Sequence, residues 1–280
     1  MAQDKYTAVW VSHSSIGDFL KCPRAYYLNN IYKDPTSGRK IGLVSPAMSL
    51  GQAVHQVLED LIQYPADERI KQPLLDQLET VWISVSGRRG GFADKTQEKE
   101  YKERGREMIK RVIKNPGPLA NKTVKLKTEG DMDLPHIYLS ETDNIILCGK
   151  VDWLEYREED DSVRILDFKT GKHDEKEDSL QLPIYNLLVS NLQPRKISGA
   201  YYWYLDKSDQ PDFVSLPDMK EGRDRVLQIA KEIKTARENE DFQCPRGGYC
   251  FACSPFEKII NNQAEFVGKG PYKKDLYVVE

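Results

Sequence analysis

Two carboxylates and a lysine carry the clearest chemical signal in this chain. Asp152 ends the motif Gly-Lys-Val-Asp, and Asp167 and Lys169 both lie in Asp-Phe-Lys-Thr-Gly. Two converging carboxylates can hold a divalent cation, and a lysine beside them can orient a water molecule. An Asp-x-Lys at a strand end is common, however, and is most often surface charge. The apolar residues around these motifs favour the chemical interpretation, because buried strands do not readily accept isolated charges.

The two motifs are predicted to meet in a β-hairpin. Residues 145–156 and 163–169 are rich in β-branched and aromatic types, and the polar run 157–162 predicts the turn between them. If the hairpin is symmetric about the middle of this turn, Asp152 lies opposite Asp167, with about 5 Å between their Cβ atoms. The lysine is two residues further along the same strand and points to the same face as Asp167. The three charged groups should therefore converge.

A predicted helix over about 179–190 follows the lysine closely enough to pack back over its strand. Gln181 and Tyr185 are one helical turn apart, so they share a face. Their uncharged hydrogen-bonding groups suit the positioning of a phosphate or a sugar. Tyr185 is equally consistent with a core position beside the leucines of the same helix.

His55, one of four histidines, lies at the margin of an apolar stripe with helical spacing in residues 50–62. A lone helical histidine is more often a structural residue than a ligand. Imidazole is nevertheless a common metal ligand. Together with Asp152 and Asp167 it would form a mixed nitrogen and oxygen site.

The cysteines form a second candidate metal site. Cys244, Cys250 and Cys253 lie in one short loop that contains proline and glycine, and Cys22 lies in Cys-Pro-Arg near the other end of the chain. Cys148, in a predicted strand, reads as a free thiol. Four such cysteines in a cytosolic protein suggest a metal site rather than disulfides. Zinc and a [4Fe–4S] cluster both accept four thiolates. Zinc sites usually use two Cys-x-x-Cys pairs and only one is present, so the one-plus-three distribution favours iron–sulfur.

The composition excludes few classes of protein. The 41 basic and 44 acidic residues nearly cancel, so the chain has no global electrostatic footprint of a nucleic-acid-binding protein. No stretch approaches the roughly 20 apolar residues that span a membrane. Residues 1–5 lack the apolar core of a secretory signal. We therefore expect a cytoplasmic protein with no membrane association.

The order of predicted elements indicates an α/β fold, with a mixed central β-sheet flanked by helices, an N-terminal helical region and a C-terminal cysteine cluster. We expect one domain over 1–280, in which 64–120 is a helical insertion and 240–256 is a cysteine-rich loop that completes a site with Cys22. The other expected elements are a helix capped by Ser12 or Ser14 and interrupted at Pro23, a link over 34–46, helices over 50–62, 73–85, 94–114 and 217–238, strands from about 123 to 169, and a strand over 197–205.

Taken together, these motifs resemble the RecB-like branch of the PD-(D/E)XK nuclease superfamily, which has a restriction-endonuclease-like core. The resemblance covers the chain from Ser14 to Cys253, and the order of the motifs is more specific than any one of them. The motifs are Cys22-Pro-Arg-x-Tyr-Tyr, Gly51-Gln-Ala-Val-His55, Gly149-x-x-Asp152, Asp167-Phe-Lys-Thr-Gly171, Gln181-x3-Tyr185 and Cys244-x5-Cys250-x2-Cys253.

The resemblance implies a role for each of these residues. A metal site would consist of His55, Asp152, Asp167 and the backbone carbonyl of Phe168. Lys169 would be catalytic, and Gln181 and Tyr185 would help to hold DNA. The same one-plus-three cysteines occur in iron–sulfur nucleases of the AddB type and in CRISPR-associated adaptation nucleases. This implies one [4Fe–4S] cluster on Cys22, Cys244, Cys250 and Cys253, with zinc as the alternative.

These features predict a metal-dependent deoxyribonuclease that uses Mg²⁺ or Mn²⁺, since carboxylates suit either ion and one imidazole shifts the preference toward Mn²⁺. By resemblance, we expect an exonuclease on single-stranded DNA ends, in DNA repair and recombination or in CRISPR adaptation, with a protein partner in such a complex. One alternative is a catalytically silent nucleic-acid-binding scaffold, against which the intact Asp152, Asp167 and Lys169 argue. Another is a redox protein, but no glycine-rich dinucleotide motif follows a strand.

Overall fold

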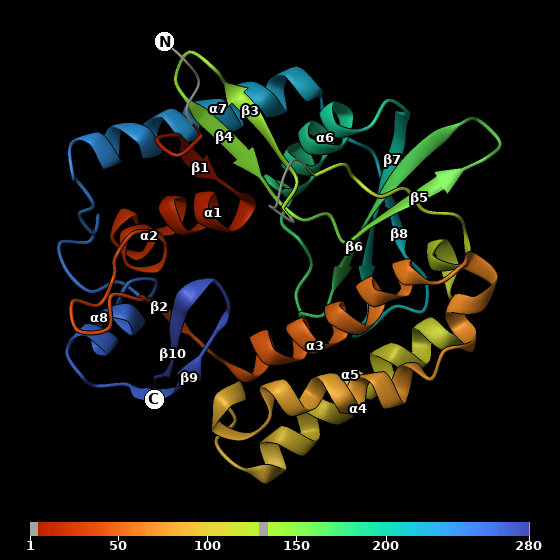
Figure 1. Cartoon of the computed structure of the whole chain (residues 1–280), viewed down its shortest axis with the longest axis horizontal. Helices are drawn as coiled ribbons and strands as arrows, with labels where there is room; N and C mark the ends of the chain where they lie inside the picture. The colour runs from red at the N-terminus through yellow and green to blue at the C-terminus, as the bar shows by residue number, and fades with distance from the viewer. Residues whose placement is uncertain (1–4, 129–133, 280) are drawn as a thin grey trace.

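A computed structural model describes residues 5–128 and 134–279 (Figure 1). Its helices are α1 (His13–Lys21), α2 (Pro23–Asn30), α3 (Pro46–Asp60), α4 (Leu74–Trp82), α5 (Lys95–Lys114), α6 (Gln181–Leu192), α7 (Met219–Glu238) and α8 (Ser254–Ile260). Its strands are β1 (Val9–Val11), β2 (Lys40–Leu43), β3 (His136–Ser140), β4 (Ile145–Cys148), β5 (Trp153–Arg157), β6 (Ser162–Lys169), β7 (Lys196–Tyr204), β8 (Asp212–Val214), β9 (Glu265–Lys269) and β10 (Lys274–Val278).

The predicted α/β class with mixed sheets and flanking helices is confirmed, but the described strands form three sheets rather than one central sheet. Their orders are β1-β4-β3, β2-β10-β9 and β5-β6-β7-β8. Each sheet is mixed, since β1 and β4, β2 and β10, and β6 and β7 pair in parallel while the other neighbours are antiparallel.

The predicted hairpin is confirmed as β5 and β6, but its first strand is shorter than expected. Trp153 pairs with Leu166, and one further step of this register sets Asp152 opposite Asp167. The segment predicted as one strand over 145–156 is instead two strands, β4 and β5, in different sheets. The chain leaves β4 at Gly149. A Cβ atom at this position would lie 3.1 Å from a methyl group of Leu188, so the segment between β4 and β5 packs closely against α6.

Two other expectations change in the structure. The region predicted as a link over 34–46 contains β2, which pairs in parallel with β10 from the far end of the chain. The predicted run of strands from about 123 yields only a bridge between Thr123 and Glu155 before β3 begins, and residues 129–133 lie outside the described part. The helices lie close to their predicted positions. Ser12 caps α1 by accepting the N–H of Ser15, and Pro23 starts α2 as its first residue.

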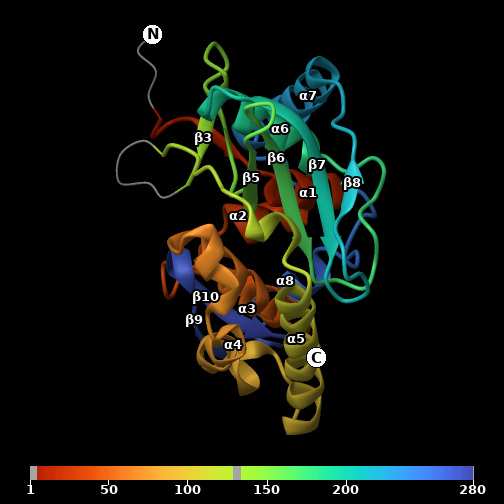
Figure 2. The same ribbon diagram turned by 90° about the vertical axis from the view of Figure 1, so that its right-hand side faces the viewer.

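The four-stranded sheet is covered on both faces, and the alternation along β6 decides which side chain meets which face. Val163 and Ile165 pack with α6, α7 and the β1-β4-β3 sheet, in one hydrophobic cluster. Leu166 and Phe168 pack with α3, α4 and α5, in a second cluster. Figure 2 shows α3, α4 and α5 on one side of this sheet and α6 and α7 on the other. By the same alternation, Asp167 and Lys169 lie toward α6.

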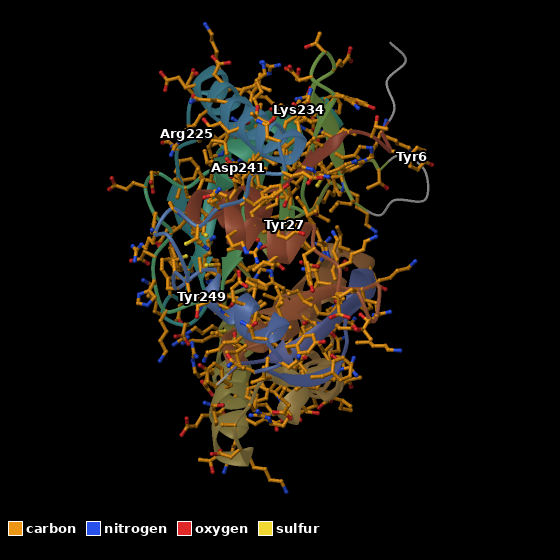
Figure 3. The ribbon with its side chains drawn as sticks, turned by 90° about the vertical axis from the view of Figure 1, so that its left-hand side faces the viewer. Tyr6, Tyr27, Arg225, Lys234, Asp241 and Tyr249 are labelled. Carbon is orange, nitrogen blue, oxygen red and sulfur yellow. The ribbon has the colours of Figure 1, made fainter. Side chains whose placement is uncertain are left out.

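The N-terminal helices pack against the C-terminal part of the chain. The ring of Tyr27 on α2 stacks on Phe242, with 5.0 Å between centroids. Figure 3 views this face, on which Tyr27, Asp241 and Tyr249 are labelled. Leu28 and Ile41 form a small core with Phe256 and Ile259 of α8. No described helix combines the length and apolar character needed to cross a membrane.

Candidate active site and metal centres

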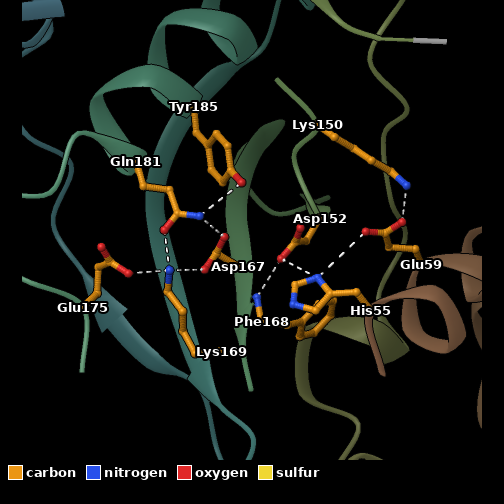
Figure 4. A network of polar contacts seen from close by, with 10 residues as sticks. All are labelled: His55, Glu59, Lys150, Asp152, Asp167, Phe168, Lys169, Glu175, Gln181 and Tyr185. Atoms are coloured by element: carbon orange, nitrogen blue, oxygen red, sulfur yellow. Dashed lines mark hydrogen bonds and ion pairs between the residues drawn. The ribbon is translucent and has the colours of Figure 1, made fainter. Parts of the chain in front are cut away.

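The two carboxylates lie at the open end of the β5-β6 hairpin, and Figure 4 shows them within the network of polar contacts around them. Asp167 is on β6 and only 2% exposed, and Asp152 directly precedes β5. One carboxylate oxygen of Asp152, Oδ2, accepts the backbone N–H of Phe168 at 2.9 Å, which fixes this side chain against β6. The structure thus brings the predicted pair together. The metal-binding role expected for the carbonyl of Phe168 stays a prediction.

Helix α3 supplies two more groups to the same spot. His55 Nδ1 lies 3.4 Å from Asp152 Oδ2 and 3.9 Å from Glu59 Oε1. Because His55 and Glu59 are four residues apart on a helix, they share the face that meets the hairpin. Ligand atoms of His55, Glu59 and Asp152 all lie within 4.8 Å of one another. Sequence reasoning identified His55 but missed Glu59, although its spacing from His55 on a predicted helix was a usable signal.

Asp167 makes its contacts on the other side of the site. Its Oδ1 accepts a hydrogen bond from Gln181 Nε2 at 2.6 Å, and its Oδ2 lies 2.9 Å from Lys169 Nζ. Lys169 Nζ also donates to Gln181 Oε1 and lies 2.6 Å from Glu175 Oε2. Glu175, in the loop between β6 and α6, was missed by sequence reasoning, because nothing in a polar loop marks one glutamate among several.

Gln181 and Tyr185 lie beneath the site, where they support its charged residues. Both are less than a tenth exposed. Gln181 Nε2 donates to Tyr185 Oη at 3.2 Å as well as to Asp167, while its carbonyl oxygen faces Lys169. The amide therefore holds the carboxylate and the ammonium in a fixed relation. The DNA-positioning role expected for the pair stays a prediction.

The charged groups of the site lie close together and partly buried, and this shifts the pKa values of several of them. Burial and the charge of Asp152 raise the pKa of Asp167 to about 7, against the opposing charge of Lys169. Burial would lower the pKa of His55, but Asp152 and the neighbouring carboxylates raise it to about 9. Burial also raises the pKa of Glu59, although Lys150 pairs with it and opposes this.

His55, Glu59 and Asp152 fit a divalent cation, while Asp167 contacts Lys169 and Gln181 and lies outside this group, so its expected role as a ligand stays a prediction. Carboxylate oxygens are the ligands that Mg²⁺ prefers, and an added imidazole nitrogen suits Mn²⁺. Asp152 and Glu59 are largely shielded from water, with side-chain exposures of 9% and 15%, and they face one histidine. A cation would offset the mutual repulsion of carboxylates that raises the pKa of Asp167.

The four predicted cysteines also come together, with sulfur atoms that all lie within 4.8 Å of one another. Cys22 is at the junction of α1 and α2, and Cys253 directly precedes α8. Cys22, Cys250 and Cys253 are buried. Cys148 is not part of this group, since its thiol donates to the carbonyl of Val11. Cys148 thus lies apart from the cluster, and its expected lack of a role in metal binding stays a prediction.

The chemistry of the cysteine group suits a metal. Burial opposes ionisation of Cys250, but the backbone N–H groups of Cys253 and Ala252 lower its pKa to about 6, which favours the thiolate, whereas burial raises the pKa of Cys22 and of Cys253. Cys250 Sγ and Cys253 Sγ are 3.6 Å apart, close to the edge of about 3.8 Å in a tetrahedron with zinc–sulfur bonds of about 2.3 Å. A [4Fe–4S] cluster has four irons between the thiolates and would need them to move apart. Four thiolates are the donor set of both.

The comparison with protein families decides the wider relationship. The family model of the PD-(D/E)XK nuclease superfamily matches residues 10–255, which include every residue of the site and all four clustered cysteines. The chain belongs to the PD-(D/E)XK nuclease superfamily. No curated protein matches the chain in a sequence search. Members of this superfamily are generally metal-dependent nucleases that act on nucleic acids.

Proposed function

We propose that this protein is a metal-dependent DNA nuclease of the RecB-like branch, which hydrolyses phosphodiester bonds and acts as an exonuclease on single-stranded ends. The observation that carries the proposal is the convergence of Asp152, Asp167 and Lys169 at the end of one hairpin, with His55 and Glu59 opposite. The RecB-like branch and the exonuclease mode are supported by the order of the sequence motifs.

In this proposal each side chain has a defined task. His55, Glu59, Asp152 and Asp167 would hold Mg²⁺ or Mn²⁺, and such an ion supplies Lewis acidity at the scissile phosphate and lowers the pKa of a bound water. Lys169 would orient the attacking water and offset the negative charge that develops on the phosphate. Gln181 would keep the ammonium of Lys169 beside Asp167 through its two hydrogen bonds. Tyr185 would hold that amide in place and help to position DNA.

We further propose that the four clustered cysteines bind a [4Fe–4S] cluster with a structural role. The one-plus-three distribution of the cysteines supports this assignment, while the short distance between two of their sulfur atoms favours the alternative, zinc. The resemblance to AddB-type and CRISPR-associated nucleases supports a role in DNA repair and recombination or in CRISPR adaptation, together with a protein partner.

Cleavage of end-labelled single- and double-stranded DNA, with and without Mn²⁺, tests the proposed activity. We expect metal-dependent shortening of single-stranded DNA from its ends. Lys169→Ala should lower the rate about 10²-fold or more while largely preserving DNA binding, because the lysine acts on the reacting phosphate. Lys172→Ala is the matched control, since this exposed lysine is only three residues away.

Two results would contradict the proposal. If Lys169→Ala cuts at the parental rate, the active site is wrongly assigned. If the parental protein binds DNA but cuts it with neither ion, the silent scaffold becomes the better account.

A further inference from the structure

The ammonium of Lys169 is already surrounded by acceptors of this chain. A lysine carries three N–H donors. In this structure Lys169 Nζ contacts three acceptors, which are Asp167 Oδ2 at 2.9 Å, Glu175 Oε2 at 2.6 Å and Gln181 Oε1. The ring of Tyr202 lies on a further side, with its centroid 5.0 Å from the nitrogen. A water or a phosphate oxygen that approaches the ammonium therefore competes with these acceptors for its N–H donors.

Glu175 is the partner that can leave at the lowest cost. Asp167 and Gln181 are buried, at 2% and 8% exposed, and they are hydrogen-bonded to each other. They also lie on β6 and α6, which packing holds in place. Glu175 instead lies in the loop 170–180, and its side chain is 22% exposed. Its backbone N–H donates to Tyr204 Oη at 3.1 Å, so the loop backbone can stay attached to β7 while the carboxylate rotates away from Lys169 and from its other partner, Ser179.

The charge of Glu175 is of the wrong sign for a site that receives a phosphate. Lys169 holds the pKa of Glu175 below its ordinary value, against the effect of burial, so this carboxylate is negative at neutral pH. A phosphate that approaches Lys169 would meet this negative charge at close range, where like charges repel strongly. The carboxylate and the phosphate therefore compete for one position on the ammonium.

We propose that Glu175 gates the catalytic lysine: its carboxylate holds Lys169 in the free protein, and a phosphate oxygen of the DNA displaces it. This inference rests on the proposed function, because it requires DNA phosphate to approach Lys169. Glu175 lies outside the Asp-x-Lys motif, so the gate is a property of the loop in this chain.

Binding of a fluorescein-labelled single-stranded oligonucleotide, measured by anisotropy in EDTA, tests the gate without any cleavage. Glu175→Gln removes the charge and keeps an acceptor, while Glu175→Ala removes both. We expect each to tighten binding about fivefold, the scale of one partly screened charge pair. Glu177→Gln is the matched control, because it removes an equal charge from an exposed position in the same loop and should leave the Kd nearly unchanged.

The inference is overturned if Glu175→Gln binds no more tightly than the parental protein, or if Glu177→Gln tightens binding as much. With Mn²⁺ added, the gate predicts a lower KM for Glu175→Gln with kcat retained. A drop in kcat at unchanged Kd would show instead that Glu175 positions the lysine for chemistry, and would overturn the gate. A parental protein that binds DNA but never cuts it would remove the nuclease proposal, and the ratio of binding constants would still decide the gate.

Discussion

The residues of the site form two halves, which differ in the groups that each charged side chain contacts. In one half, Asp167 and Lys169 contact each other and the amide of Gln181, so both are held by short, local contacts. In the other half, His55 and Glu59 reach the hairpin from α3, where His55 contacts Asp152 and the ring of Phe168 and Glu59 pairs with the exposed Lys150. A cation bound by the second half would lie among ligand atoms of His55, Glu59 and Asp152 that are all within 4.8 Å of one another.

Metal titration of activity tests this half of the site. If His55 and Glu59 bind the cation, His55→Ala and Glu59→Gln should each raise the Mn²⁺ or Mg²⁺ concentration needed for half-maximal activity about tenfold or more. Asp60→Asn is the control, since it removes a carboxylate from the next position of α3, where it pairs with Gln56. An unchanged metal requirement with a lowered Tm would mean that the two residues are structural.

Among the elements, α3 links the active site to the rest of the fold. Its C-terminal half carries His55 and Glu59, and its buried residues pack against α4 and α5. The approach to α5 is close, because a Cβ atom on Gly105 would lie 3.1 Å from a methyl group of Leu50. The glycine at position 105 lets α3 and α5 pack closely over the face of the four-stranded sheet that carries Leu166 and Phe168.

Thermal unfolding tests this packing. Gly105→Val should lower the free energy of unfolding by about 1–3 kcal/mol, because the added methyl groups overpack the contact with Leu50, Leu78 and Val54. Each kcal/mol corresponds to about 2–4 °C in Tm for a chain of this class. Gly17→Ala in α1 is the control, since no atom lies within 4 Å of its added Cβ, and it should stabilise by up to about 1 kcal/mol. A Tm for Gly105→Val at or above the parental value would mean that Leu50 moves aside freely.

Across the whole molecule, a strand pairing and the cysteine group add to the packing that joins the N-terminal and C-terminal parts of the chain. Strand β10 pairs in parallel with β2, in the register Lys274 to Lys40. The cysteine group joins Cys22, between α1 and α2, to the loop before α8. A metal held by all four thiolates would therefore restrain the N-terminal helices against the C-terminal segment.

Metal analysis of anaerobically purified protein tests this link. Cys22→Ser and Cys250→Ser should both lose the bound metal, although the two residues are far apart in the sequence, while Cys148→Ser should retain it. For the [4Fe–4S] assignment we expect brown protein with about four irons per chain. One zinc per chain in colourless protein would overturn the iron–sulfur assignment and keep the four-thiolate site. Loss of metal in Cys148→Ser would overturn the choice of ligands.

The sequence by itself determined those parts of the protein that depend on local periodicity. The strand period and the symmetric turn set Asp152 opposite Asp167, and the helical period put Gln181 and Tyr185 on one face. Capping by Ser12 and the restart at Pro23 were likewise local properties. Each of these depends on residues within one element or one turn, so the backbone geometry alone relates them.

The tertiary structure decided which distant elements meet. Periodicity places His55 at the margin of an apolar stripe, but only the packing of α3 against the four-stranded sheet brings it to Asp152 and includes Glu59. The division of the strands into three sheets, the pairing of β2 with β10 and the strands and helix formed by residues 254–278 were not predicted. The physical reason is that the hydrophobic effect, which drives the burial of apolar side chains, has no preferred direction. An apolar face specifies that it must be covered, while shape and topology select the element that covers it.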